Sequence, residues 1–393
     1  MENNNFQYAD PYPYYKKLRD FNPVFQDKNG VWFLSRYDHV KMLQSDMRFA
    51  RQHPASQGFV SNNSLDSKLE SILSKWLLLN DPPRHTYLRN VLSDLFDARF
   101  IKNMKIMIEG VADSTIKSMM KQPEVNFMTA FSYPYAVTII NNLLGVNLDI
   151  DTTRKWAQSL STALDHGTDE DLKKITPDLI HMFEYFSTLI STYDTKNKND
   201  WISKLIYFNQ SKKLSHEEVV STCIFLLLTG HETVQLTSGL FIRSLLLHPS
   251  QCKLLQNNPE LLGSSIEEIF RYESAFSRIS RWSKEDIRVD GVTIPKNQLV
   301  VGNINAANRD ERKFTNPDIF DIRRKNNRHI ALGHGIHHCL GALLARIELN
   351  IAFSKLVPYL HRLELLDSQT EWLPNSSLRY LYNLKIKTSK KVW

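Results

Sequence analysis

The chain contains few cysteines and lacks long hydrophobic runs, and both features exclude classes of protein. Cys223, Cys252 and Cys339 are the only cysteines in 393 residues, too few and too scattered for a disulfide framework. The longest apolar run, Cys223 to Leu228, is far shorter than the roughly 20 residues that span a bilayer. The N-terminus also lacks the pattern of a signal peptide. We therefore expect a cytoplasmic protein without a membrane anchor.

No repeat or low-complexity stretch occurs, and glycine and proline are dispersed instead of gathered in a linker. This pattern predicts one continuous domain over residues 1–393. A hydrophobic content of 42% is ordinary for a globular protein. The net charge of +7 would suit an acidic partner, but charge alone does not locate a basic patch. We expect most of this charge to be solvated surface and expect no nucleic-acid partner.

Hydrophobic periodicity predicts a mainly α-helical fold with a small β region. Ser215 and Glu218 have the spacing of a capping box, which predicts a helix from Ser215 to about Leu247. Two further helices are predicted over Pro259–Tyr272 and from just after Cys339 to Leu356. The remaining expected elements are a short helix near His39–Gln44 and β segments at Val31–Ser35, Val292–Ile294, Leu299–Gly302 and Leu378–Ile386.

The segment IALGHGIHHCLGALLAR, residues 330–346, places Cys339 among glycines directly before a helical stretch. Glycines allow a loop to pass close to a flat cofactor, and a helix start favours a thiolate that can bind metal. The alternative is a structural cysteine at a turn, which is the more common role of a lone cysteine. The glycine spacing favours the metal ligand.

This spacing resembles the cysteine-ligand signature of the cytochrome P450 family, carried by Gly333, Gly335, His337, Cys339 and Gly341. The resemblance implies that Cys339 is the axial ligand of a haem b iron and that the other four residues lie against the cofactor. Two positions depart from the family, which usually has Phe at Leu332 and, in bacterial members, often Pro at Leu343. A lost aromatic beside the sulfur would alter the iron's potential.

Thr229-Gly230-His231-Glu232-Thr233, within the long helix, resembles the family's oxygen-activation motif. The resemblance implies that Gly230 adjoins the haem and that Thr233 and Glu232 relay protons to iron-bound oxygen. Thr229 replaces a commoner Ala and would narrow this space. The alternative is a Thr bonded to its own helix backbone beside a solvated Glu.

Asp81 to His85, followed by Arg89, resembles the family's haem-propionate segment, in which the His and the Arg lie one turn apart. Arg281 and His337 match two further propionate partners. An alternative compatible with this role is a helix start with Asp81 as its cap and proline in its first turn. His329 has no clear assignment.

Glu268 and Arg271 resemble the family's Glu-x-x-Arg pair, although surface helices carry many such pairs. The resemblance implies a structural role together with the segment from Asn316 to Arg324. The pair takes no part in redox chemistry.

Aligned positions imply a set of substrate contacts: Phe225, Leu228, Thr229, Ser277 and Ile279. Phe59 to Leu78 would cover the substrate pocket, and Tyr380 and Leu381 would contribute from the late strands. A buried core would select the same residue types.

The resemblance covers nearly the whole chain and implies the triangular cytochrome P450 fold, with its long central helix over the haem. It implies a haem-thiolate monooxygenase that inserts one oxygen atom from O2 into a C–H bond of a hydrophobic small molecule or acyl chain, which could be carrier-bound. Two electrons would come from a ferredoxin or flavodoxin with its reductase. One alternative is a peroxide-driven haem-thiolate hydroxylase, against which the pair Glu232 and Thr233 argues. A remote alternative is a zinc-stabilised nucleic-acid binder with His334, His337, His338 and Cys339 as ligands.

Overall fold

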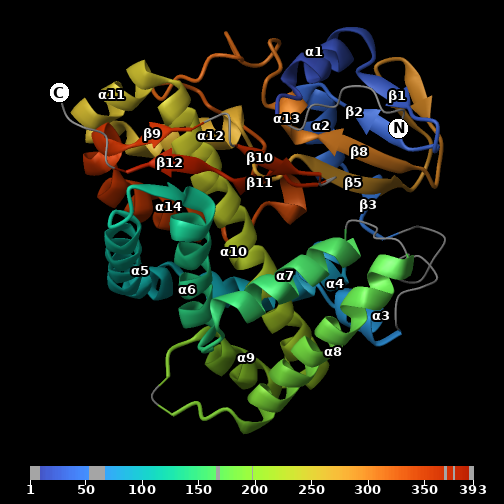
Figure 1. The fold of residues 1–393 in the computed structure, drawn as a ribbon. Coiled ribbons are helices and arrows are strands. Elements are labelled where there is room, and N and C mark those ends of the chain that lie inside the picture. The colour runs from blue at the N-terminus through green and yellow to red at the C-terminus, as the bar shows by residue number, and fades with distance from the viewer. Residues whose placement is uncertain are drawn as a thin grey trace. The chain divides into compact units, whose positions relative to one another are not determined.

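The computed structural model describes residues 9–52, 67–164, 169–196, 198–366, 370–374 and 377–388. It divides into two compact units, and Figure 1 labels the helices and strands of the chain. Unit 1 comprises Met1–Ala50, Ile108–Tyr135 and Thr233–Trp393, and unit 2 comprises Arg51–Met107 and Ala136–Glu232. Three helices contribute residues to both units: α5 (Ala98–Met119), α6 (Tyr133–Leu144) and α10 (His216–Leu247).

Unit 1 contains a five-stranded sheet of order β1-β2-β8-β5-β3. β2 and β8 run parallel, and the other neighbours are antiparallel. The strands are β1 (Val24–Gln26), β2 (Trp32–Leu34), β8 (Leu299–Asn303), β5 (Arg278–Ser283) and β3 (Phe49–Ala50). The strands predicted near residues 31–35 and 299–302 are therefore confirmed, and the structure pairs them as neighbours in this sheet.

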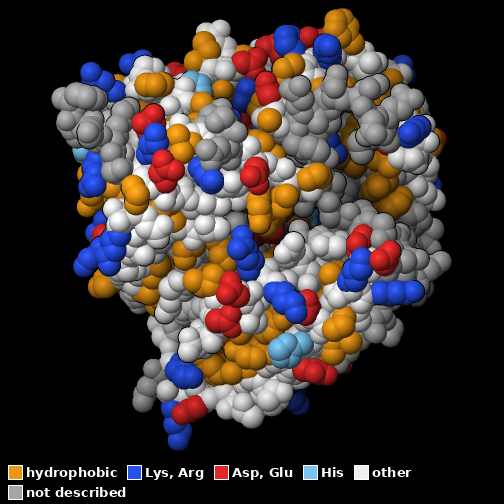
Figure 2. Space-filling view, viewed as in Figure 1, with side chains coloured by type: hydrophobic (Ala, Val, Ile, Leu, Met, Phe, Trp, Pro, Cys, Tyr) orange, Lys and Arg blue, Asp and Glu red, His pale blue; other side chains and the backbone are white. Residues whose placement is uncertain are grey.

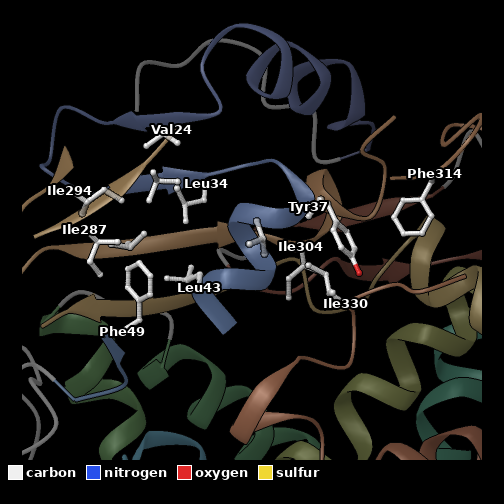
Figure 3. Packing of buried hydrophobic residues seen from close by; sticks show 14 residues of the cluster. Val24, Leu34, Tyr37, Leu43, Phe49, Ile287, Ile294, Ile304, Phe314 and Ile330 are labelled. Carbon is white, nitrogen blue, oxygen red and sulfur yellow. The ribbon is translucent and has the colours of Figure 1, made fainter. Parts of the chain in front are cut away.

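The core of this sheet packs against α2 (Tyr37–Ser45), where a shorter helix was predicted. Leu43 of α2 belongs to the same buried cluster as Leu34 of β2 and Val300 of β8 (Figure 3). Gly302 lies where α2 crosses the sheet, because a Cβ atom there would come within 2.9 Å of Cδ2 of Leu43. The apolar face of α2 thus covers the sheet beside residues 330–341, the cysteine loop.

Unit 1 also contains helices and small sheets. The helices are α1 (Tyr12–Phe21), α11 (Pro249–Asn257), α12 (Leu262–Tyr272), α13 (Ile304–Ala307) and α14 (Ala342–Leu356), with the π-helical segment η3 (Met128–Ser132) and the 3-10 segments η4 (Pro259–Leu261), η5 (Gly335–His337) and η6 (Val357–Arg362). The strands are the pair β6 (Ile287–Val289) and β7 (Val292–Ile294), the pair β10 (Glu371–Leu373) and β11 (Tyr380–Asn383), and the three-stranded sheet β4 (Glu124–Asn126), β12 (Lys385–Lys387) and β9 (Glu364–Leu365).

The regular elements in the described residues of unit 2 are all helical. Its elements are α3 (Ser67–Leu73), η1 (Leu77–Leu79), α4 (Arg84–Ser93), η2 (Asp94–Phe96), α7 (Ile150–Leu164), α8 (Asp169–Thr192) and α9 (Trp201–Gln210), with the shared helices named above. The mainly α-helical class with a small β region is confirmed.

The long helix α10 begins with the predicted capping box. The N–H of Ser215 donates to Glu218 Oε2 at 2.8 Å, and the N–H of Glu218 donates to Ser215 Oγ at 3.2 Å. Among the described helices, α10 alone has the length and composition to cross a membrane, but 78% of its most apolar window is buried. A helix apolar on all sides and buried to this degree is typical of a protein core.

Two predicted elements differ in the structure. The helix predicted from Pro259 starts as the 3-10 turn η4, and α12 begins at Leu262. The single β segment predicted over Leu378–Ile386 consists of β11 and β12, which belong to different sheets. The chain changes sheet at Leu384, whose N–H donates to the side chain of Asn126 and whose carbonyl accepts from Phe127.

Candidate functional site

Cys339 lies in the loop between η5 and α14, and its side chain is exposed. Its N–H donates to the carbonyl of Leu332 at 2.8 Å, which folds the loop back on itself. α14 begins three residues later with Gly341 as its N-cap. The sulfur therefore lies near the positive end of a helix dipole, which favours the thiolate form that binds metal.

Two of the three glycines of the loop have conformations that glycine alone adopts readily. The φ angles of Gly333 and Gly335 are +78° and +72°, in the left-handed region. A Cβ atom at Gly335 would lie 2.8 Å from Cα of Ser45, at the end of α2. Gly341 has an ordinary φ of −84°. The glycines thus allow the loop to turn and to pack on α2.

Side chains from α2 and from the end of α13 hold the start of this loop. The hydroxyl of Tyr37 donates to the carbonyl of Arg328 at 2.6 Å. The side chain of Asn308 accepts from the N–H of Ile330 at 2.9 Å, and Gln44 donates to the Ile330 carbonyl at 3.3 Å. These contacts fix the backbone that leads to Cys339.

The predicted pair Glu268 and Arg271 is fully buried on α12. Arg271 also donates to the carbonyls of Pro317 and Ile319, at 2.7 and 3.2 Å. Arg324 donates to both oxygens of Glu268 at 3.2 and 3.0 Å. The structure thus brings the pair together with the segment from Asn316 to Arg324.

On α10, Glu232 and Thr233 differ in environment. Glu232 is 8% exposed, and burial raises the pKa of its carboxyl to about 8. This carboxyl therefore carries a proton at neutral pH. Thr233 is half-buried. A buried neutral acid beside a hydroxyl residue is suited to proton donation.

Sequence reasoning gave no role to His231, which lies between Gly230 and Glu232. Its Nδ1 lies 2.5 Å from the carbonyl of Leu227, and a carbonyl can only accept, so Nδ1 carries a hydrogen. Burial lowers the pKa of His231 to about 4, so the ring is neutral. At Gly230 a Cβ atom would lie 2.4 Å from Cδ1 of Ile140. Packing against Ile140 of α6 thus favours a small residue at position 230, and the cofactor role of Gly230 stays a prediction.

The predicted propionate residues lie on regular elements of each unit. His85 and Arg89 are one turn apart on α4, with His85 1% exposed. In unit 1, Arg281 is 6% exposed on β5, and His337 ends the turn η5. Arg281 donates to the carbonyl of Ser280 at 2.8 Å.

The predicted cap of α4 is wrong. Pro83 occupies the N-cap position, and no side chain caps the helix. The carboxylate of Asp81 instead accepts from the backbone N–H groups of Arg51 and Gln52, at 2.9 to 3.0 Å. The sequence gave no signal for these two amides, because they lie about 30 residues away from Asp81 along the chain. Local spacing alone suggested the cap.

The predicted substrate residues have defined neighbours within their own units. In unit 2 the Phe225 ring lies 5.3 Å from that of Trp76, Leu228 is 3% exposed, and the hydroxyl of Thr229 donates to the Phe225 carbonyl. In unit 1 the hydroxyl of Ser277 donates to the carbonyl of Ser377 at 3.0 Å.

Two other predicted contacts belong to packed regions of unit 1. Ile279 packs against the core of the five-stranded sheet, and Leu381 is 0% exposed. Tyr380 is half-buried on β11. Of the predicted segment from Phe59 to Leu78, residues 59–66 lie outside the described residues.

The remote zinc alternative has no support. No group of three or more His, Cys, Asp or Glu side chains in the described ranges could hold a metal ion. On the face in Figure 2, Lys and Arg side chains are interspersed with Asp and Glu, as expected for solvated surface charge.

Comparisons with known proteins agree with this geometry. The family model described as cytochrome P450 matches residues 181–381. The biotin biosynthesis cytochrome P450 of Bacillus subtilis is 32% identical over 384 residues, which cover 96% of each chain. The monooxygenase PikC of Streptomyces venezuelae is 31% identical over 96% of this chain and 91% of its own length. A crystal structure of P450BioI with an acyl carrier protein ligated to hexadec-9Z-enoic acid has a TM-score of 0.89 and 31% identity, covering 97% of this chain and 99% of that one.

The chain belongs to the cytochrome P450 family. It is accordingly a monooxygenase with haem b as cofactor and O2 as co-substrate, and its family typically receives electrons from redox partners. The residues present fit a cytochrome P450 haem, because an exposed thiol stands at a helix start in a loop that two left-handed glycines shape.

Proposed function

We propose that Cys339 is the proximal sulfur ligand of the haem in this cytochrome P450. The observation that carries the proposal is the exposed Cys339 side chain in a fixed loop before α14. When bound, a haem with a thiolate ligand activates O2 for insertion of one oxygen atom into a C–H bond. The other two cysteines, Cys223 and Cys252, are buried.

The carbon monoxide difference spectrum of the reduced protein tests this ligand. We expect the thiolate band in the wild type and its loss in Cys339→Ser. The control Cys252→Ala should retain the band, because Cys252 is buried on α11. A thiolate band that survives in Cys339→Ser would overturn the assignment.

We propose that Glu232 and Thr233 deliver protons, and that His85, Arg89, Arg281 and His337 bind the haem propionates. Cations and imidazole donors bind carboxylates through charge-assisted hydrogen bonds. The buried, protonated carboxyl of Glu232 supports proton delivery. The four basic side chains come from the regular elements α4, β5 and η5, which supports propionate binding.

We propose that the substrate is a hydrophobic acyl chain. Phe225 and Leu228 are apolar, and the hydroxyls of Thr229 and Ser277 each donate to a backbone carbonyl within the protein. Two related structures contain acyl ligands, namely P450BioI with an acylated carrier protein and CYP267B1 with myristic acid. Titration with free myristic acid and with myristoyl acyl carrier protein, followed by haem absorption, should give a spectral shift with at least one form. A shift with testosterone alone would contradict an acyl substrate.

We propose a ferredoxin or flavodoxin as the electron donor and a cytoplasmic location. The net charge of +7 would favour association with such acidic proteins, and the buried thiols of Cys223 and Cys252 suit a reducing compartment. Turnover that needs the reductase system would support the electron donor. Equal turnover with peroxide alone would contradict it.

A further inference from the structure

Glu267 precedes the buried Glu268 on α12 but binds different partners. Its Oε1 accepts from Nε of Arg346 at 2.6 Å, and its Oε2 accepts from Nη2 of Arg346 at 3.0 Å. Nε2 of His329 lies 3.0 Å from Oε2 of Glu267. The neighbouring carboxylates thus bind different parts of the chain: Glu268 binds the segment that contains Arg324, and Glu267 binds His329 and Arg346.

The hydrogen bonds of His329 define the state of its ring. The N–H of Ala331 donates to Nδ1 of His329 at 3.3 Å, so Nδ1 is the acceptor and Nε2 carries the hydrogen that goes to Glu267. Burial alone would raise the pKa of Glu267, but its hydrogen bonds with His329 and Arg346 and the charge of Arg346 lower it to about 2. The network therefore joins an imidazole N–H, a carboxylate and a guanidinium.

The network connects both ends of the cysteine loop. His329 directly precedes residues 330–341, and Arg346 lies on α14, where its guanidinium also donates to the Ala342 carbonyl at 3.4 Å. The N–H of Ala342 in turn donates to the Cys339 carbonyl at 3.4 Å, so the Arg346 guanidinium lies at the start of α14, next to the backbone that follows Cys339. A positive charge near the sulfur would withdraw electron density from the iron, whose potential depends on such neighbours.

We propose that Glu267 is a positioning residue for Cys339: it ties His329 and Arg346 together across the cysteine loop and neutralises the Arg346 charge near the sulfur. This inference rests on Cys339 as haem ligand. Without Glu267, the positive charge of Arg346 at the start of α14 would be uncompensated. Without Arg346, the carboxylate would be left uncompensated.

The two charges predict opposite shifts of the haem reduction potential. Glu267→Gln should move the potential in the positive direction, because it leaves the Arg346 charge unopposed. Arg346→Met should move it in the negative direction. The double variant should return close to the wild type, since both charges are gone. A role confined to holding the loop would not give shifts of opposite sign.

The matched control is Asp113→Asn, which removes the carboxylate partner of Lys355, another basic residue of α14, at 2.9 Å. This variant should leave the potential unchanged. Glu267→Gln should also release haem to apomyoglobin about tenfold faster, as is typical when a residue behind a metal ligand is lost. If Glu267→Gln does not retain haem, two conservative variants are measured in its place. Glu267→Asp keeps the charge, and His329→Gln keeps a hydrogen-bond donor. Each should stay closer to the wild-type potential than His329→Leu.

Shifts of the same sign, or none, in Glu267→Gln and Arg346→Met would overturn this inference while leaving Cys339 as the ligand. Absence of the thiolate band in the wild type would instead overturn the proposed ligand itself. The two failures are therefore distinguishable in the same set of samples.

Discussion

Nη2 of Arg271 lies 2.8 Å from Oε1 of Glu268, and both side chains are 0% exposed. Arg324 and Asn327 also donate to the same carboxylate, at 3.0 and 3.1 Å. A buried charge with this many donors is costly to leave uncompensated, because the protein interior does not solvate the remaining charges. Glu268 therefore fixes the chain from Asn316 to Asn327, which leads directly into the cysteine loop.

We predict that Glu268→Ala lowers the free energy of unfolding by about 3–5 kcal/mol, the range for breaking a buried ion pair. Urea unfolding of the purified protein measures this change. The control is Glu170→Ala, which breaks an exposed pair with Lys174 on α8 and should cost less than about 1 kcal/mol. Similar costs for the two variants would show that burial does not determine the contribution of Glu268.

A second prediction concerns Gly335. Gly335→Ala should destabilise the protein by more than about 1 kcal/mol, because the left-handed conformation alone costs an alanine about 1–2 kcal/mol and its Cβ atom would also meet Ser45. Thermal unfolding and haem retention measure the effect. Gly110 on α5 provides the control, because no atom lies within 4 Å of an added Cβ. Gly110→Ala should stabilise the helix by about 0.5–1 kcal/mol. A tolerated alanine at position 335 would refute the packing argument.

Thr233→Ala should retain haem but divert electrons to peroxide, since a missing hydroxyl interrupts proton delivery at the proposed relay. Product formed per reductant consumed, measured with hydrogen peroxide release, gives the coupling. We expect coupling to fall at least about tenfold, because losing an acid–base contribution typically costs about 100-fold or more. Thr222→Ala removes a hydroxyl that donates to the Glu218 carbonyl on the same helix and should remain coupled. Full coupling in Thr233→Ala would exclude this role.

Patterns among residues close in sequence predicted the elements and the motifs, whereas contacts between residues far apart in sequence could not be predicted. The capping box at Ser215 and the periodicity of α10 depend on neighbours within one turn, so both were predictable. Asp81 failed as a cap because its partners, the amides of Arg51 and Gln52, are distant in sequence. His329 received no role for the same reason, since Glu267 lies 62 residues away. The glycines and the cysteine of the loop indicated the family, whereas the residues that hold the loop gave no local signal.

Coupling in the wild type should also depend on pH through Glu232. Burial raises the pKa of this carboxyl from 4.5 to about 8, so it holds its proton up to about pH 8 and is ionised above. If it donates protons, coupling in the wild type should fall as the pH rises through about 8. Glu232→Gln should be poorly coupled at every pH, because an amide cannot transfer a proton. Coupling measured from pH 6 to 9.5 tests both statements.

Stability should respond to the same titration with a defined sign. Because the folded pKa is the higher one, the contribution of Glu232 is fully present below about pH 4.5 and is lost as the pH rises through about 8. Glu348 on α14 is the matched control, since burial raises its pKa to about 8 as well. Glu348→Gln should weaken the loss of stability at alkaline pH yet leave the coupling profile unchanged. If Glu348→Gln instead removed the pH dependence of coupling, the proton would come from α14 and Glu232 would have no part in the relay.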